Sequence, residues 1–227
     1  MSSAASQRGV FITLEGGEGA GKSTQIKRLV ARLAARGIEA VATREPGGTP
    51  GAEAIRGLLV TGDVARWDAV TETLLHYAAR REHVEKTVKP ALQRGAWVIS
   101  DRFADSTMAY QGHAGAVGAA RVAALHKLVL GDFTPDLTLI LDLPVQVGLA
   151  RAKSRANTAG ANTAGANAVE DRYERMGLAF HEALRKAFLD IAAAEPQRCR
   201  VVAADTDADS VEAALWAQVA QRFKLPL

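Results

Sequence analysis

Short apolar runs alternate with amphipathic stretches along most of the chain. The apolar runs predict strands over residues 10–14, 39–43, 96–100, 137–143 and 200–204. Several of these runs are almost continuously apolar, which is typical of parallel strands covered on both faces. The amphipathic stretches predict helices, including residues 71–94, 118–130, 174–194 and 211–223. This alternation predicts a single α/β domain over residues 1–227, a doubly wound parallel sheet of five strands flanked by helices, with ligands at the carboxyl ends of the strands.

Residues 156–168 break the alternation. They repeat the pentapeptide Ala-Asn-Thr-Ala-Gly and contain no large apolar side chain. Such a segment cannot bury enough surface to offset the entropy lost on ordering, so we expect a flexible loop. Basic side chains flank it on both sides: Arg151, Lys153, Arg155, Arg172 and Arg175. Two interpretations are open, a linker with a chance cluster of charges and a mobile lid, at approximately 151–175, that closes over phosphates.

The composition excludes several classes of protein. No apolar stretch is long enough to span a bilayer, and the N-terminus lacks the apolar core of a signal peptide. The single cysteine, Cys199, cannot form an internal disulfide. A net charge of +3 suits polyanionic ligands, but no dense Lys/Arg stripe with interleaved aromatic residues indicates a nucleic-acid surface. We therefore expect a cytoplasmic protein with no membrane and no nucleic-acid partner.

A glycine-rich motif directly follows the first predicted strand. Residues 16–23 read Gly-Gly-Glu-Gly-Ala-Gly-Lys-Ser, and a helical pattern starts at Thr24. Such a turn points several backbone N–H groups at one small volume, which suits a polyphosphate. Lys22 is expected to reach the β- and γ-phosphates, and the Ser23 hydroxyl to bind Mg²⁺. A turn that binds nothing is disfavoured, because strand and helix flank the motif as a P-loop requires. The predicted nucleotide-binding residues are Gly16, Gly17, Glu18, Gly19, Ala20, Gly21, Lys22, Ser23 and Thr24.

Further candidate side chains follow other strands. Asp101 and Arg102 end the third predicted strand, where the carboxylate can hold Mg²⁺ through water and the guanidinium can bind a phosphate. Arg44 follows the second strand and begins the run Arg-Glu-Pro-Gly-Gly-Thr. His76 and Arg80 are four residues apart, hence on one helix face. Each arginine taken alone is as easily a surface charge, so the motifs have to be judged together.

Taken together, these motifs resemble those of thymidylate kinase, in particular the bacterial form. The resemblance runs nearly end to end. Its most specific parts are the runs at 43–49 and 101–112, and it includes the P-loop with Glu18, residues 77–80, 135–138 and 171–174. The resemblance implies transfer of the γ-phosphoryl group of MgATP to dTMP, which gives dTDP for dTTP synthesis. It also implies a homodimer.

The resemblance assigns the acceptor site residue by residue. Glu18 would accept a hydrogen bond from the sugar 3′-hydroxyl, while Arg44 and Arg102 hold the acceptor phosphate. Arg80 and Gln111 would contact the thymine edge. The remaining residues would line the pocket or exclude a ribose 2′-hydroxyl: Ser106 and Thr107 in the first role, and Tyr110 in the second.

The resemblance also assigns the donor side. Arg151 would pack on adenine, and Arg155 in the lid would reach the transferring phosphoryl group. Because Gly19 occupies the place where some relatives carry a P-loop arginine, the cation has to come from elsewhere, and Arg155 and Lys153 of the lid are the available source. The predicted catalytic residues are Lys22, Arg155, Arg102 and Glu18, and the predicted metal-binding residues are Ser23 and Asp101.

The chain departs from the family pattern in two places. The lid is longer by the pentapeptide repeat, and His76 stands where relatives usually carry a phenylalanine stacked on thymine. Two alternative functions are weighed, another nucleoside-monophosphate or deoxynucleoside kinase and a P-loop regulatory switch. The switch is disfavoured because its guanine-specifying and switch-loop motifs are missing.

Overall fold

Five parallel strands form the central sheet. The computed structural model describes residues 8–160 and 172–226, and the side chains among these except those of 155–160. The strands are β1 (Phe11–Glu15), β2 (Ala40–Arg44), β3 (Trp97–Asp101), β4 (Leu137–Asp142) and β5 (Cys199–Ala203). Their order across the sheet is β2-β3-β1-β4-β5, and all neighbours pair in parallel. This architecture confirms the fold class predicted from the sequence.

Three strands run one residue further toward the carboxyl edge than the apolar pattern predicts. They end on the polar residues Glu15, Arg44 and Asp101, which an apolar run does not include. Register places both Leu14 and Arg44 opposite Asp101. The polar ends of β1, β2 and β3 therefore meet at one edge of the sheet, where a doubly wound fold binds its ligands.

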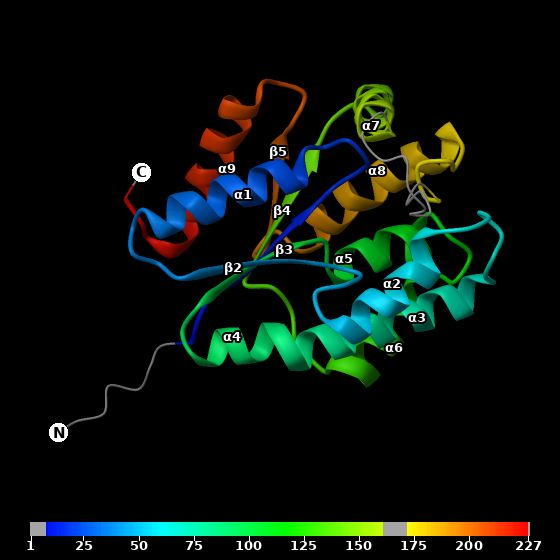
Figure 1. The fold of residues 1–227 in the computed structure, drawn as a ribbon, viewed down its shortest axis with the longest axis horizontal. Helices are drawn as coiled ribbons and strands as arrows, with labels where there is room; N and C mark the ends of the chain where they lie inside the picture. The colour runs from blue at the N-terminus through cyan, green and yellow to red at the C-terminus, as the bar shows by residue number, and fades with distance from the viewer. Residues whose placement is uncertain (1–7, 161–171, 227) are drawn as a thin grey trace.

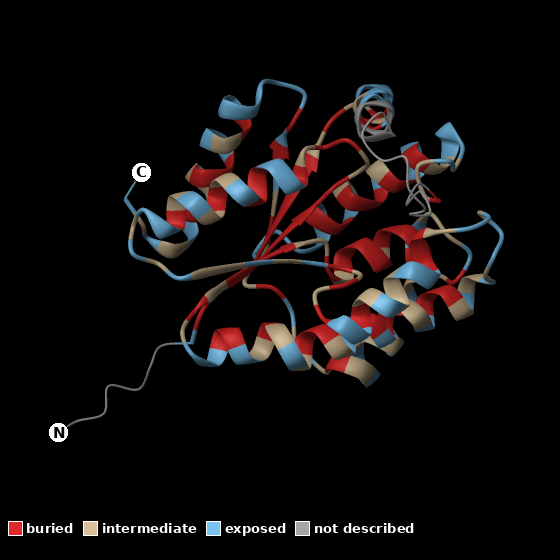
Figure 2. Cartoon of the chain, viewed as in Figure 1, coloured by how far each residue is buried: buried red, intermediate tan, exposed pale blue. Residues whose placement is uncertain are grey.

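Helices cover both faces of the sheet (Figure 1). On one face, α1 (Lys22–Ala34) and α9 (Ala208–Phe223) pack on strand side chains such as Ile12 and Leu139. On the other face, Phe11 packs with the helical segment around Val88, and Ile140 packs with α8 (Leu178–Ala194). The buried residues concentrate along the strands and the helix faces that meet them (Figure 2). A sheet covered in this way holds its carboxyl edge rigidly in place.

The predicted helix over 71–94 is three segments in the structure. These are α3 (Ala69–His83), a π-helical segment η1 (Val84–Val88) and α4 (Lys89–Gln93). Pro90 stands in the first turn of α4, where its missing N–H is tolerated. The other predicted helices correspond to α6 (Ala119–Leu130), α8 and α9. The start of α8 was predicted too early, and α9 begins earlier than predicted because Asp207 caps it by accepting from two backbone N–H groups.

Four helical segments were not predicted as helices. They are α2 (Pro50–Val60), α5 (Ala104–Thr107), the π-helical η2 (Met108–His113) and α7 (Val145–Gly160). The flexible loop predicted from residue 156 is wrong as far as Gly160, because α7 continues through the first repeat. Alanine, the strongest helix former, recurs there and lets the helix continue. The rest of the predicted loop and lid, residues 161–171, lies outside the described part of the chain.

No helix in the described ranges is both long and apolar enough to cross a membrane.

Candidate active site

The P-loop joins the end of β1 to the start of α1. Gly16 and Gly19 adopt positive φ angles of 129° and 71°, which side chains other than hydrogen rarely tolerate. A Cβ on Gly19 would also lie 1.9 Å from the carbonyl oxygen of Gly148, so α7 approaches the loop too closely for any other residue. The helix begins at Lys22, two residues before the predicted Thr24. The loop therefore has the strand–turn–helix context that phosphate binding requires.

Lys22 folds back over the P-loop. Its Nζ donates to the carbonyl oxygens of Gly16 at 3.2 Å and Gly17 at 2.9 Å. Burial and the nearby guanidinium of Arg102 lower the pKa of Lys22. The ammonium is thus held by two backbone oxygens of the P-loop. From this position it can move to a phosphate oxygen of a bound nucleotide.

Ser23 and Asp101 lie together at the mouth of the P-loop. The Ser23 hydroxyl donates to Asp101 Oδ2 at 2.8 Å, across the gap between α1 and β3. The described residues contain no cluster of three or more histidine, cysteine or acidic side chains that could hold a metal. One hydroxyl and one carboxylate nevertheless suit Mg²⁺, which keeps several waters and takes its other ligands from phosphates.

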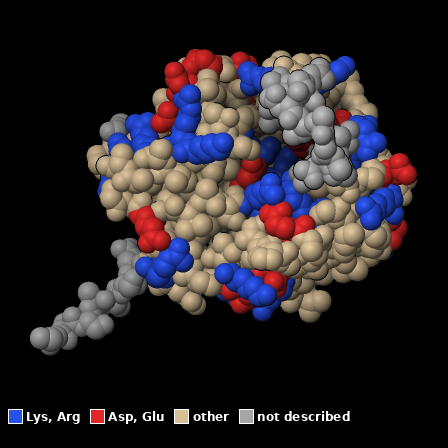
Figure 3. Space-filling view, viewed as in Figure 1, with Lys and Arg blue, Asp and Glu red and all other residues tan. Residues whose placement is uncertain are grey.

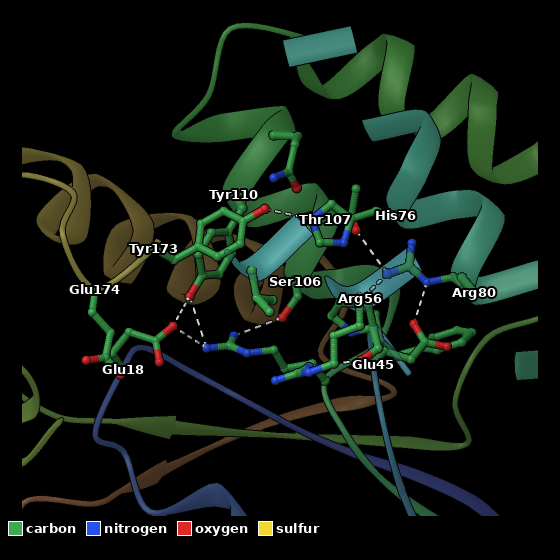
Figure 4. Close-up of a pocket in the computed structure, with 15 residues that line it drawn as sticks. Glu18, Glu45, Arg56, His76, Arg80, Ser106, Thr107, Tyr110, Tyr173 and Glu174 are labelled. Atoms are coloured by element: carbon green, nitrogen blue, oxygen red, sulfur yellow. Dashed lines mark hydrogen bonds and ion pairs between the residues drawn. The ribbon is translucent and has the colours of Figure 1, made fainter. Parts of the chain in front are cut away.

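Arg102 links Glu18 to Tyr110. Its Nη2 donates to Glu18 Oε1 at 2.8 Å and to the Tyr110 hydroxyl at 3.0 Å, and that hydroxyl donates to the same carboxylate oxygen at 2.8 Å (Figure 4). Burial opposes the charge on Glu18, but Arg102 and Lys22 outweigh it and lower its pKa to about 2. Glu18 is therefore a fixed carboxylate that can only accept hydrogen bonds.

Glu15 fixes the backbone that carries Arg102. Arg102 has a positive φ of 70°, which is uncommon for a residue with a side chain. The buried carboxyl of Glu15 accepts from the Phe103 N–H at 2.7 Å and from the Ser106 hydroxyl at 2.6 Å, directly after that corner. Burial and the neighbouring Asp105 raise the pKa of Glu15 to about 8. No pattern in the sequence indicates this contact, because Glu15 is only the polar residue that follows an apolar run.

A cavity of about 130 Å³ that opens to solvent lies beyond the P-loop (Figure 4). Predicted acceptor-site residues that line it are Glu18, His76, Arg80, Arg102, Ser106, Thr107, Tyr110 and Gln111. The structure thus brings together eight residues that were predicted from separate motifs.

Arg80 and Gln111 line this cavity, and each has one buried polar atom with no hydrogen-bond partner among the described residues. Arg80 donates from Nε to Glu45 at 2.7 Å and from Nη2 to the Thr107 hydroxyl at 2.9 Å, and its Nη1 is buried with no partner. Gln111 donates from Nε2 to Glu72, and its Oε1 is buried with no partner. A buried polar atom without a partner is costly, so one donor and one acceptor here await a ligand.

His76 lies beside Tyr173 in the same cavity. His76 Nε2 and the Tyr173 hydroxyl are 2.9 Å apart, so the imidazole is fixed by a hydrogen bond at its edge. Burial and the positive charges of Arg80 and Arg172 lower the pKa of His76 to about 3. The ring is therefore neutral at physiological pH, which suits stacking on a base.

Arginines gather in a second hollow beside the first (Figure 3). It is lined by the P-loop residues from Glu18 to Ser23, together with Arg44, Glu45, Arg56, Asp101 and Arg102. Arg44 also pairs with Glu53, at 2.8 Å from its Nη2. Glu18, Glu45, Arg56 and Arg102 line both hollows, so the two spaces adjoin at these side chains.

Sequence reasoning missed Arg56, Glu45, Tyr173 and Glu174, which also line the first cavity. Arg56 stands on α2, the helix that was not predicted. The signal for that helix was present, because Thr49 caps it by accepting from the Ala52 N–H at 3.1 Å and Pro50 occupies the first turn.

The structure describes only some of the residues that were predicted to bind the phosphoryl donor. Arg151 stands on α7 and donates from Nη1 to the carbonyl oxygen of Ala204 at 2.8 Å, just after β5, and it lines neither hollow. The side chain of Arg155 lies outside the described part of the chain. Lys153 is exposed on α7.

Comparison with known proteins gives one consistent result. The family model of thymidylate kinase matches residues 14–215. Thymidylate kinases of Caulobacter vibrioides and Afipia carboxidovorans are 56% and 53% identical, over 96% and 95% of this chain and 99% and 91% of their own length. The crystal structure of thymidylate kinase from Ehrlichia chaffeensis superposes with a TM-score of 0.71 at 32% identity, over 93% of this chain and 99% of that one. The chain therefore belongs to the thymidylate kinase family, as its motifs predicted.

Proposed function

We propose that the two adjoining hollows hold dTMP and MgATP and that the chain transfers the γ-phosphoryl group between them, with dTDP and ADP as products. The observation that carries this proposal is the junction of the two spaces at Glu18, Arg56 and Arg102. Phosphoryl transfer needs the acceptor and the donor held in line, with cations around the charge that spreads in the transition state. The junction supplies that arrangement, and membership of the thymidylate kinase family supports dTMP over the acceptors of other monophosphate kinases.

The thymine edge would meet Arg80 and Gln111. Thymine presents an acceptor at O4 and a donor at N3–H. The unpartnered Nη1 of Arg80 is a donor, and the unpartnered Oε1 of Gln111 is an acceptor. This complementarity supports binding of the base in the first cavity. His76 would cover the ring face, and Thr107 would close the pocket behind Arg80.

The sugar and the acceptor phosphate would occupy the junction. The ionised Glu18 would accept from the 3′-hydroxyl, while the Tyr110 ring would fill the space that a ribose 2′-hydroxyl needs. Arg44, Arg56 and Arg102 line the second hollow and would surround the acceptor phosphate. Arginine suits this role because its planar fork binds phosphate oxygens in pairs.

The donor would occupy the P-loop. Its backbone N–H groups and Lys22 would hold the β- and γ-phosphates, and Ser23 with Asp101 would hold Mg²⁺, which neutralises phosphate charge when bound. Arg155 would bring a further cation to the transferring group from the lid, and Arg151 would pack on adenine. Both contacts would require α7, which carries Arg151 and Arg155, to lie against the bound nucleotide.

A homodimer and a cytoplasmic location belong to the same proposal. Val70 and Leu74 on α3 are 50% and 51% exposed, and Leu128 on α6 is 82% exposed. Because α3 packs beside α6, these apolar side chains can form one surface for a second copy of the chain. The cytoplasm is where ATP and deoxynucleotides are available.

An assay of coupled ADP release tests the function. With ATP and Mg²⁺ in excess, we expect turnover with dTMP and little with dCMP, GMP or AMP. Equal rates across this panel would overturn the proposal, as would ADP release that does not depend on the monophosphate.

A further inference from the structure

Gln111 could face the cavity with either end of its amide, and a buried contact decides which end it presents. Nε2 donates to Glu72 Oε1 at 2.8 Å. Gln111 and Glu72 are only 5% and 9% exposed, so water does not compete for this bond. Oε1, at the other end of the amide, is buried and has no partner in the described part of the chain, and Gln111 is one of the residues that line the cavity.

Glu72 is itself held by Arg172. Arg172 Nη1 lies 2.5 Å from Glu72 Oε2, and the arginine is 3% exposed. Its guanidinium also donates to the backbone carbonyl oxygens of Leu59, in the last turn of α2, and of Asp63 and Val64, in the connection that follows. The guanidinium is therefore anchored from several sides, and its ion pair holds the Glu72 carboxylate in one position.

A charged carboxylate can only accept hydrogen bonds. If the Gln111 amide rotated by half a turn, its Oε1 would face Glu72 Oε1, and two acceptors would meet in a buried site. The 2.8 Å bond would be lost, and the carboxylate oxygen would be left without that partner. The pairing with Glu72 thus excludes the orientation in which Gln111 would present a donor to the ligand.

We propose that Glu72 is a positioning residue for base selection: held by Arg172, it fixes the Gln111 amide so that the cavity presents an acceptor to position 3 of the pyrimidine. The cavity then favours bases that carry a hydrogen at N3, such as thymine, over bases whose N3 is an acceptor, such as cytosine. This inference rests on the proposed contact between Gln111 and the thymine edge. It adds that the selectivity of the contact is set by two residues that lie behind it.

The substitution Glu72→Gln tests the inference because it keeps the shape and removes the charge. Arg172 would take the carbonyl oxygen of the new amide, since it can only donate. The new amide nitrogen would then face Gln111, which would have to turn its own oxygen away from the cavity. The cavity would present a donor, and the preference for an N3–H would be lost.

The measurement is calorimetric titration of dTMP and of 5-methyl-dCMP, whose N3 is an acceptor and carries no hydrogen. The 4-amino group of this analogue acts on Arg80 in every variant alike, so a change in the preference between variants reports on Gln111. We expect the wild type to bind dTMP roughly 10-fold more tightly than the analogue, as one buried hydrogen bond provides. In Glu72→Gln the preference should fall below about 2-fold, with unchanged affinity for a non-hydrolysable ATP analogue. Glu82→Gln, on the same helix and paired with the exposed Lys86, is the matched control and should keep the wild-type preference.

Glu72→Gln could fail to fold, because it leaves a buried arginine without its counter-charge. The double variant Glu72→Gln/Arg172→Gln removes both charges together, and it too should lose the preference, since nothing then orders the amides. A wild-type preference retained in either folded variant overturns the inference. Gln111→Met separates this result from a failure of the proposed contact. If the preference for dTMP over the analogue is the same in the wild type and in Gln111→Met, Gln111 does not contact N3. The inference then fails together with that proposed contact.

Discussion

Arg102 Nη2 lies 2.8 Å from Glu18 Oε1, and this ion pair stands where the two hollows meet. A second nitrogen of the same guanidinium donates to the Gly16 carbonyl oxygen at 3.1 Å and to the Ser106 hydroxyl at 3.0 Å. Arg102 thereby connects the P-loop to the acceptor cavity. Because Tyr110 shares the carboxylate oxygen, a nucleotide that engages one member of the group must affect the others.

Replacing Arg102 with lysine should test this geometry. Lysine keeps the charge but cannot direct donors at several acceptors in one plane. We expect kcat/KM for dTMP to fall by roughly 10²-fold or more, as it does when a preorganised donor is removed. Affinity for ATP should change little. Arg94→Lys, an exposed arginine paired with Glu39, serves as the control in the same steady-state assay. An Arg102→Lys enzyme with wild-type kcat/KM would show that the fork geometry is not used.

Lys22→Ala should abolish transfer while the fold persists. Among the described residues, Lys22 donates only to two P-loop carbonyl oxygens, so its loss removes few contacts. Its absence leaves the charge on the β- and γ-phosphates uncompensated. Single-turnover phosphoryl transfer and thermal unfolding should be measured together. Lys27→Ala, an exposed lysine on the same helix, should retain full activity. Normal turnover in Lys22→Ala would contradict the phosphoryl-transfer proposal itself.

Arg155→Ala should lower kcat far more than it raises KM for dTMP. A cation that acts on transition-state charge is worth about 10³–10⁵-fold in related phosphoryl transfers. Deletion of residues 161–165, one copy of the repeat, should be much milder because this segment carries no charge and α7 ends before it. Rapid-quench kinetics of both variants compare the two effects. If the deletion lowered kcat more than Arg155→Ala does, the repeat and not Arg155 would carry the catalytic role.

The sequence predicts the sheet and most of the acceptor site for a common reason. Apolar runs identify buried strands, and the residues that follow such runs meet at one edge of a parallel sheet. Arg102 and the P-loop could be placed from this rule and from their motifs. Glu72 and Arg56 could not, because each lies within a helical segment and reads as a surface charge until the helices are packed.

The missed and misplaced elements have identifiable causes. The pattern over 71–94 is continuous, and nothing in it shows that five residues will form a π-helical segment, η1. The first repeat was expected to be a loop because it lacks large apolar groups, but its alanines allow α7 to reach Gly160. The pattern of apolar and polar residues predicts which segments are buried. In the first repeat, the helix propensity of the alanines determines the structure instead.

The position of Tyr110 predicts a role in the discrimination between deoxyribose and ribose. Its ring is 7% exposed, and its hydroxyl bonds to both Glu18 and Arg102. Tyr110→Ala should open the space beside C2′ and bring kcat/KM for ribothymidine monophosphate closer to that for dTMP. Tyr110→Phe keeps the ring and should retain the discrimination, although its activity should fall because two hydrogen bonds are lost. If both variants discriminate as the wild type does, the deoxyribose preference arises elsewhere.

His76 gives a prediction for stability against pH in the nucleotide-free protein. Its pKa falls from 6.5 to about 3 in the fold, because burial and the charges of Arg80 and Arg172 disfavour the protonated ring. Between these two values the unfolded chain binds a proton that the native protein does not, so stability falls as the pH falls below about 6.5. From pH 7.5 to pH 5.0 this single group should reduce the free energy of unfolding by about 1 to 2 kcal/mol. His76→Phe keeps an aromatic ring and removes the titration, so it should lose that much less stability over the same interval. Urea unfolding at both pH values measures the difference, with His113→Gln, an exposed histidine, as the control that should follow the wild type. Parallel losses in the wild type and His76→Phe would mean that the imidazole is protonated in the native protein near its ordinary pKa, and the neutral ring proposed to cover thymine would have to be abandoned.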